Sequence, residues 1–232
     1  MTGYYEPEIK AYNYKKSGTY PVYKINIEKH GKKIFNNSRM KINQGILDNK
    51  GLEIAWVDNE VEAFFLHIQG SGRLRFDNGT VKKIRYAGSN NKKYTAIGKV
   101  LIEQGAIKKN KVSMFSIKKW LYQNQKKARQ IMEKNNRYIY FEEYQGEIKG
   151  SSNLDLIPFV SLAVDPRYYD IGDILLITDY KSKKSFLGIA HDTGAAIKGK
   201  NRVDLFTGYG KNAEKIAAEL KQSITVKKLN PI

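Results

Sequence analysis

Short segments in which hydrophobic and polar side chains alternate, or in which hydrophobic ones dominate, recur along the chain and predict β-strands. In the N-terminal part the predicted strands are residues 20–27, 52–57, 61–68 and 137–142. Asp58-Asn59 is expected to form the turn between the second and third of these strands. Another strand should follow Gln-Gly-Ser-Gly (69–72) and lead into Asp77-Asn-Gly79, which is typical of hairpin turns.

The middle of the chain shows helical spacing instead. Ile97, Val100 and Leu101 would share one face of a helix, and Gly105 suits its C-terminal end. Ser116 is predicted to cap a helix over residues 117–125, and a second, basic helix is expected over 126–135. A short helix or turn is predicted over residues 39–45.

The pattern changes near residue 143, where we place a junction between two domains. Beyond it, strands are predicted at residues 156–164, 173–179, 186–190, 202–206 and 224–229, with a helix over 213–222. Many short strands at regular spacing, separated by glycine turns, indicate a small β-barrel.

The composition is strongly basic. Lys and Arg number 41 against 23 Asp and Glu, so the formal net charge is +18 over 232 residues. Such a charge attracts polyanions, whether nucleic acid, acidic membrane surfaces or an anionic cell-wall polymer. The lysines of the second predicted helix indicate a solvated face, because no aromatic residues are interleaved with them as nucleic-acid binding would require.

The chain has no cysteine, and its histidines at positions 30, 67 and 191 lack the spacing of metal ligands, so no metal or other cofactor is expected. No apolar run approaches the ~18 residues that span a bilayer. Patterned sequence begins almost at once, with Gly3-Tyr-Tyr-Glu-Pro7. We therefore expect that Met1 precedes a trimmed chain from which any targeting segment has been removed.

Three aspartates, Asp165, Asp192 and Asp204, each stand at the edge of a predicted strand and could converge in a compact barrel. Neighbouring carboxylates and burial both raise a carboxyl pKa, which an acid catalyst needs. Asp204 lies between Val203 and Leu205, and desolvation by such neighbours would keep it protonated. The alternative for each aspartate is a structural role, and Asp165 precedes Pro166 as a turn opener does.

Several small-residue motifs accompany these aspartates. They are Gly-Tyr-Tyr-Glu-Pro (3–7), Gln-Gly-Ser-Gly (69–72), Tyr-Ala-Gly-Ser-Asn (86–90) with Ile-Gly-Lys (97–99), and Asp-Thr-Gly-Ala-Ala-Ile-Lys-Gly (192–199) before Asp204. Together, and in this order, they resemble the MltA-type lytic murein transglycosylases. The last motif resembles the "3D" module, which is named for three aspartates. The resemblance covers nearly the whole chain.

This resemblance implies a mainly β fold. A double-psi β-barrel would be built from both chain ends (residues 1–8 and 144–232), with a β-rich domain containing a few helices (9–143) inserted and a substrate groove between them. The implied reaction is non-hydrolytic cleavage of the β-1,4 bond between N-acetylmuramic acid and N-acetylglucosamine in peptidoglycan, which leaves 1,6-anhydro-N-acetylmuramic acid ends. It also implies a periplasmic, outer-membrane-associated protein, for which a lipid anchor on the native form stays open. We expect a monomer whose partner is a peptidoglycan glycan strand.

The resemblance assigns the catalytic acid, then base, to Asp204, with Asp192 and Asp165 as supporting carboxylates. The substrate-binding residues carried over from the matching motifs are Tyr5, Glu6, Gln69, Gly70, Ser71, Tyr86, Gly194 and Lys198. For the tyrosines at the start, ordinary strand packing is the alternative to stacking on a sugar ring. Two positions depart from the family pattern: Glu6 stands where threonine is frequent, and Ala195 where a second glycine is.

Three other functions stay open at this point. A hydrolase on the same barrel would release reducing ends, whereas a transglycosylase leaves none. A glycan-binding module without catalysis would tolerate the loss of Asp204. A nucleic-acid binder would show strongly salt-dependent DNA binding, but the chain contains no recognition motif for it.

Overall fold

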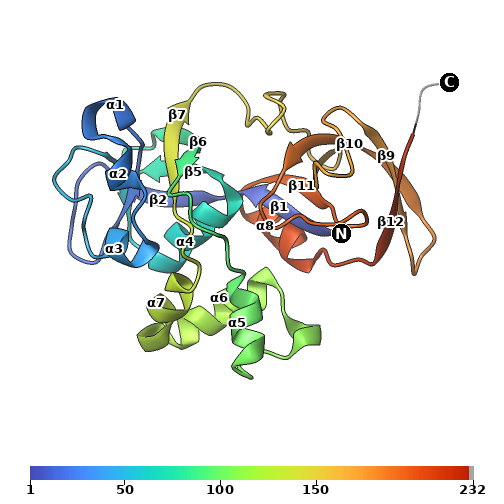
Figure 1. The fold of residues 1–232 in the computed structure, drawn as a ribbon, viewed down its shortest axis with the longest axis horizontal. Helices are drawn as coiled ribbons and strands as arrows, with labels where there is room; N and C mark the ends of the chain where they lie inside the picture. The colour runs from blue at the N-terminus through green and yellow to red at the C-terminus, as the bar shows by residue number, and fades with distance from the viewer. Residues whose placement is uncertain (230–232) are drawn as a thin grey trace. The chain divides into compact units, whose positions relative to one another are not determined.

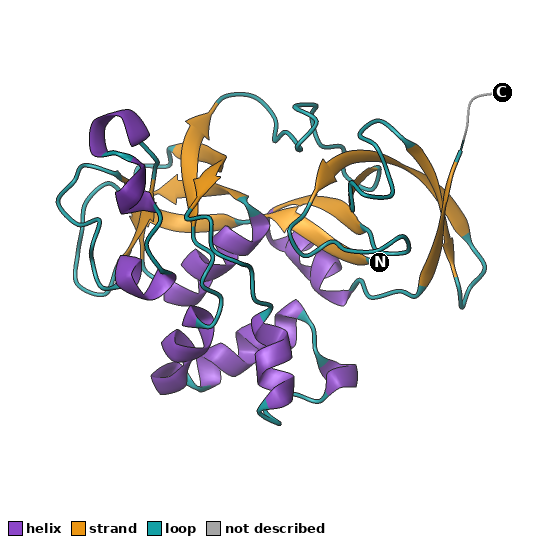
Figure 2. Cartoon of the chain, viewed as in Figure 1, coloured by secondary structure: helices purple, strands orange, loops and turns teal. Residues whose placement is uncertain are grey.

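The computed structural model describes residues 1–229 and divides the chain into two compact units. The first consists of Met1–Glu6 together with the chain from Gly146 on, and the second of Pro7–Gln145. The junctions expected from the sequence were residues 8 and 143, and the last three residues of the expected range 144–232 lie outside the described ones. Each unit contains one six-stranded sheet, and helices are fewer in the first (Figures 1 and 2). The chain is therefore mainly β, with some helices.

The first unit combines the N-terminal strand with five strands and one helix from the C-terminal part. Its elements are β1 (Thr2–Glu6), β8 (Ser161–Val164), β9 (Ile174–Asp179), β10 (Ser185–Thr193), β11 (Asp204–Tyr209), α8 (Gly210–Glu219) and β12 (Ile224–Lys228). The strand order is β1-β11-β8-β10-β9-β12. The pairs β1/β11 and β10/β8 are parallel and the others antiparallel. In Figure 1, β1 lies beside β11, the strand from the opposite end of the chain, and α8 packs against both.

This sheet is open, whereas the regular strand spacing predicted a closed barrel. Within residues 1–229 the ladder begins at β1 and ends at β12, with no ladder between these two strands. A single isolated bridge joins Thr2 on β1 to Lys221, just before β12. The two edges of the sheet therefore come close at this point but do not pair over several residues. The core on one face of the sheet includes Leu162, Val164 and Leu205.

The second unit has the sheet order β3-β4-β2-β5-β6-β7, in which only β2 and β5 are parallel. Its strands are β2 (Glu8–Tyr12), β3 (Tyr20–Tyr23), β4 (Glu53–Val57), β5 (Ser71–Phe76), β6 (Val81–Ser89) and β7 (Ile139–Tyr144). Its helices are α1 (Ile27–His30), α2 (Lys32–Phe35), α3 (Arg39–Asn43), α4 (Glu60–Gln69), α5 (Ile97–Glu103), the 3₁₀ turn η1 (Lys109–Lys111), α6 (Met114–Gln123) and α7 (Gln125–Glu133).

The strand predicted for residues 61–68 is wrong, because this segment forms the helix α4. Asn59 caps this helix, because its side chain accepts hydrogen bonds from the backbone N–H groups of Val61 (3.0 Å) and Glu62 (3.1 Å). Gly70 ends it in the left-handed conformation, with φ of 82°. Ala63 and Leu66 pack on the sheet while Phe64 and Phe65 pack with α5, α6 and α7, so the helix is apolar on two faces and shows no amphipathic period.

Two further boundaries differ from the prediction for local reasons. Helix α6 begins after Ser113, not after Ser116. The Ser113 side chain accepts from the Ser116 backbone, and the Ser116 hydroxyl accepts from the Ser113 backbone, which makes a capping box. Strand β8 begins only at Ser161, since Pro158 and the residues around it form a turn in which the Ser161 hydroxyl accepts a hydrogen bond from the Ile157 N–H (2.8 Å).

Candidate active site

A row of four residues crosses the first sheet and brings two of the predicted carboxylates onto one face. Thr2 on β1 pairs with Asp204 on β11, and Asp204 pairs with Ala163 on the central strand β8. On the other side of β8, the partner of Ala163 is Asp192 on β10. Paired residues in adjacent strands project to the same face, so the backbones of Asp204 and Asp192 are roughly 10 Å apart on that face. The side chain between them, that of Ala163, is small and buried.

The Asp204 carboxylate is held in place by two residues, Thr2 and Arg202. Its Oδ1 accepts a hydrogen bond from the Thr2 hydroxyl and lies 3.0 Å from Nη2 of Arg202. Along the described chain no hydrogen bond or ion pair is formed by Oδ2, and the side chain is 17% exposed. One oxygen of Asp204 is thus fixed, and the other is available.

The apolar environment expected for Asp204 is not what surrounds it. Val203 and Leu205 belong to the core on the opposite face, because consecutive residues of a strand point to opposite sides of the sheet. Instead the neighbours of the Asp204 carboxylate are polar: the guanidinium of Arg202 and the hydroxyl of Thr2.

Asp192 is the second carboxylate on the row, and it is half-buried. Its Oδ1 accepts hydrogen bonds from the backbone N–H groups of Ser151 (2.9 Å) and Thr193 (2.8 Å). Burial raises the pKa of Asp192 above its ordinary value, while these backbone donors act against the rise. Beside it a β-bulge inserts His191, whose Nδ1 lies 2.9 Å from the Ser161 hydroxyl.

Tyr4 adds a group to this face that the sequence analysis did not single out. It lies two residues after Thr2 on β1, and its ring contacts that of Phe206 at a centroid distance of 5.3 Å. Its hydroxyl is the one side-chain polar atom of residues 1–229 that is both inaccessible to solvent and without a hydrogen-bond partner. Burial, and then the charges of Asp192 and Asp204, raise the pKa of Tyr4 well above its ordinary value. Side chains two residues apart on a strand point to the same face, so the contact of Thr2 with Asp204 would have indicated that Tyr4 lies on this face too.

The third aspartate is not part of the row. Asp165 follows β8 and is fully buried, with Oδ2 2.6 Å from Nη2 of Arg167 and 2.7 Å from the backbone N of Gly199. The hydrogen bonds from Arg167, and also that from Gly199, hold the pKa of Asp165 far below its usual range. Asp165 is therefore a permanently charged anchor that attaches the loop before β11 to the end of β8.

The remaining predicted residues of the first unit are placed in two different environments. Tyr5 and Glu6 are buried, with 2% and 0% exposure, so neither side chain offers a surface to a ligand in this structure. Gly194 and Lys198 lie in the loop between β10 and β11, where Lys198 is exposed. At Gly194 a Cβ would come within 2.7 Å of Ile197, so a side chain there would displace the loop.

Three of the four predicted residues of the second unit lie at one junction, between α4 and β5. Gln69 is the last residue of α4, Gly70 is its left-handed cap, and Ser71 begins β5, where it pairs with Arg85. Ser71 is buried at 6% exposure, whereas Tyr86, the residue after Arg85 on β6, is 48% exposed.

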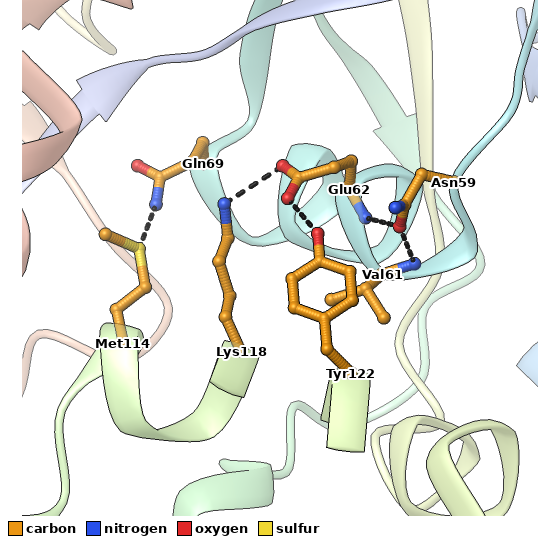
Figure 3. A network of polar contacts seen from close by, with 7 residues as sticks. All are labelled: Asn59, Val61, Glu62, Gln69, Met114, Lys118 and Tyr122. Atoms are coloured by element: carbon orange, nitrogen blue, oxygen red, sulfur yellow. Dashed lines mark hydrogen bonds and ion pairs between the residues drawn. The ribbon is translucent and has the colours of Figure 1, made fainter. Parts of the chain in front are cut away.

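The Gln69 side chain is joined to helix α6, since its Nε2 lies 3.6 Å from Sδ of Met114 (Figure 3). Next to it, Glu62 on α4 accepts from Nζ of Lys118 (2.9 Å) and from the Tyr122 hydroxyl. This network fixes α6 along α4, and so fixes the position of Gln69.

Over residues 1–229, no group of three or more His, Asp or Glu side chains is arranged to hold a metal ion. In the same part of the chain no helix has the length and apolar character needed to cross a membrane.

These features define a two-unit, mainly β protein with a candidate site built from aspartate side chains on one sheet. Comparison with protein families identifies it further. Residues 1–142 match the MltA specific insert domain and residues 160–230 match the 3D domain. The chain belongs to the MltA family.

Named relatives support this assignment. The chain is 35% identical to membrane-bound lytic murein transglycosylase A of Vibrio cholerae, over 99% of this chain and 64% of that protein. It is 32% identical to the Escherichia coli K12 protein of the same name, over 92% of this chain and 60% of that protein. This chain thus spans less than two thirds of the length of these relatives.

Solved structures support the same family assignment. A membrane-bound lytic murein transglycosylase from Agrobacterium tumefaciens has a TM-score of 0.89 at 28% identity, covering 99% of this chain and 73% of that one. E. coli MltA with bound chitohexaose has a TM-score of 0.84 at 28% identity, covering 99% and 71% respectively.

Proposed function

We propose that this protein is a lytic transglycosylase of peptidoglycan. It would cleave the β-1,4 bond between N-acetylmuramic acid and N-acetylglucosamine without water and leave 1,6-anhydro-N-acetylmuramic acid ends. The observation that carries the proposal is the row of Asp204, Ala163 and Asp192 on one sheet face, in a chain that belongs to the MltA family. The chitohexaose bound to the E. coli relative supports a β-1,4-linked glycan as the ligand.

In this proposal Asp204 is the acid and then the base. Its Oδ1 is fixed by Thr2 and Arg202, so Oδ2 carries the proton that passes to the departing glycosidic oxygen. The carboxylate so formed then takes the proton of the sugar's C6 hydroxyl as that oxygen attacks C1. The same carboxyl group thus gives up one proton and takes up another, and no water is consumed.

Asp192 lies on the same sheet face as Asp204, as the second carboxylate of the row. Asp192 also supplies negative charge near a developing oxocarbenium centre. Because burial raises the pKa of Asp192, it is the second candidate for the acid.

We further propose the finer architecture of the family for the whole molecule. The two parallel pairs, β1/β11 and β8/β10, support a double-psi arrangement in which the Thr2–Lys221 bridge stands where the barrel would close. The insert would bind the glycan through Gln69, Gly70, Ser71 and Tyr86. The 3D domain would bind it through Gly194 and Lys198, and Asp165 supports the loop that carries them.

The proposed place of action is the periplasmic side of the outer membrane, because the named relatives are membrane-bound murein transglycosylases. A lipid anchor on the native form and a monomeric state complete the proposal. The net charge of +18 would hold the protein on the carboxylates of peptidoglycan. Pelleting with purified sacculi should therefore decline steeply as salt is raised, and salt-independent pelleting would contradict this use of the charge.

The reaction is tested by mass spectrometry of the soluble products from purified sacculi. The unmodified protein should release anhydro-muropeptides, whereas Asp204→Asn should lose activity by about 10²-fold or more. Asp170→Asn is the matched control, because its side chain is 87% exposed and lies off the row. Reducing-end products would indicate a hydrolase, and pelleting without products a binding module. Full activity of Asp204→Asn would refute its role, and Asp192→Asn would then be measured.

A further inference from the structure

A second candidate site lies wholly within the second unit. A cavity of about 460 Å³ opens among β3, β4, α3, α4, α7 and the chain before β7. Its volume falls within the range of about 300–1,000 Å³ that is typical of small-molecule sites. None of the residues assigned to cleavage or to the substrate groove lines it. The chemistry of its lining therefore needs its own explanation.

The floor of the cavity holds a buried cation without an anion. Arg39 is 3% exposed and donates through Nε to the carbonyl of Asn135 (2.8 Å) and through Nη2 to that of Arg137. Its Nη1 lies 2.9 Å from Nδ1 of His67. Burial lowers the pKa of Arg39 to about 10, so it stays charged at neutral pH. No carboxylate of residues 1–229 forms an ion pair with it, although burying an unpaired charge is costly.

Two more donors on the floor lack an acceptor. Burial, and then the charge of Arg39, lower the pKa of His67 well below its ordinary value, so its ring is neutral. Since a guanidinium only donates, Nδ1 of His67 accepts from Arg39, and Nε2 carries the hydrogen. Neither this N–H nor the hydroxyl of Tyr138 has a hydrogen-bond partner in the described chain. Both residues are more than nine-tenths buried and line the cavity, so their remaining exposed surface faces it.

The rim has the opposite character. Asp48 is engaged by the Tyr23 hydroxyl (2.9 Å), and Glu60 by Arg129 (2.6 Å). Glu53 lines the cavity too, and within residues 1–229 its carboxylate forms no hydrogen bond or ion pair. The site thus presents a positive, donor-rich floor and a free negative group at its edge, with the half-buried rings of Trp56 and Tyr20 as walls.

We propose that this cavity binds a short peptide that carries both a carboxylate and an ammonium group. The carboxylate lies on the floor, where it accepts from Arg39, His67 and Tyr138 and supplies the missing counter-charge. The ammonium group lies at Glu53. Binding of such a zwitterion follows from the cavity alone. The choice of the peptidoglycan stem peptide as its source rests on the proposed function.

Intrinsic fluorescence can report on this site. The chain has two tryptophans; Trp56 lines the cavity and Trp120 does not, so Trp120→Phe leaves a single reporter. This variant is titrated with a stem tripeptide (L-Ala, D-Glu, diaminopimelate), with its fully amidated form and with free L-alanine. The tripeptide should change the emission with saturation, and the amidated form should bind at least tenfold more weakly.

Tyr138→Phe provides the decisive variant, because it removes only a hydroxyl that has no partner in the free protein. Its melting temperature should be unchanged, while its affinity for the tripeptide should fall about tenfold. Tyr140→Phe is the matched control on the same chain segment, since the Tyr140 hydroxyl donates to the Phe35 carbonyl (2.9 Å). It should lower the melting temperature and leave the affinity unchanged.

The outcomes separate this proposal from the proposed reaction, because no glycan is cleaved in the titration. Absence of saturation by every probe at millimolar concentration, with the fold intact, would overturn the site. Equal binding of the free and amidated tripeptides would overturn the role of the carboxylate. Tight binding of alanine without preference for the tripeptide would support the zwitterion site and refute the stem peptide as its source.

Discussion

Gly150 offers the sharpest test of how the first sheet supports Asp192. A Cβ on this residue would lie 2.2 Å from the backbone carbonyl oxygen of His191, the neighbour of Asp192 on β10. Ordinary contacts begin at 3.4 Å, so in Gly150→Ala the turn has to move by about 1.2 Å. The hydrogen bond from the Ser151 N–H to Asp192, now 2.9 Å, would then exceed hydrogen-bonding distance.

The expected cost combines overpacking, about 1–3 kcal/mol, with the loss of a hydrogen bond to a charged group, about 1.5–3 kcal/mol. The two contributions overlap, and we expect about 2–4 kcal/mol in total. For a chain of this size that lowers the melting temperature of the first unit by roughly 5–15 °C. Loss of one donor also raises the pKa of Asp192 further, so the rate of product release from sacculi should fall as well.

Differential scanning calorimetry and the sacculus assay measure both effects. Gly88→Ala serves as the control, since its Cβ would meet only the tip of the Ile25 side chain, at 3.1 Å, which can rotate away. This variant should stay within about 1 kcal/mol of the parent protein. A Gly150→Ala protein with unchanged melting temperature and activity would refute the close approach of this turn to β10 and the support it gives to Asp192.

Three further outcomes are expected. Because burial raises the pKa of Asp192 in the folded state, that state binds the proton of its carboxyl group more tightly than the unfolded state does. The stability of the protein should therefore decline as pH rises from about 4 through the folded-state pKa. Asp192→Asn should lack this decline when the urea midpoints of the two proteins are compared across pH. Ser113→Ala removes the cap of α6 and should cost about 1 kcal/mol in urea unfolding. Glu62→Gln replaces the carboxylate that pairs with the buried Lys118 ammonium by a neutral amide and should cost roughly 1–3 kcal/mol in stability. Adding Lys118→Met to this variant should restore most of the lost stability.

Local patterns were sufficient for much of the fold. The helices from Ile97 and Gln125, the hairpin at Asp77-Asn-Gly79 and most strands of the first unit follow from periodicity and turn residues. Residues 61–68 were misassigned because a helix buried on two faces has no amphipathic period, and only its caps, Asn59 and Gly70, distinguish it from a buried strand.

The candidate site was predicted less completely, because its contacts join distant parts of the chain. The motifs indicated Asp192 and Asp204, but their common register partner, Ala163, depends on sheet pairing that no local pattern encodes. The environment expected for Asp204 was wrong, since neighbours in sequence lie on the opposite face of a strand. Tyr4 was missed for the same reason, because it faces Asp192 and Asp204 only through the pairing of β1 with β11.

That pairing also determines the order in which the molecule can be completed during synthesis. Strand β1 leaves the ribosome well before its partner β11, which begins only at Asp204, about 200 residues later. At 5–20 residues per second this delay is about 10–40 s, long enough for the second unit, Pro7–Gln145, to fold in the meantime. Throughout that interval β1 remains an unpaired strand edge, and the face that carries Thr2, Asp204 and Asp192 does not yet exist. The candidate site is therefore assembled only after the second unit has been synthesised.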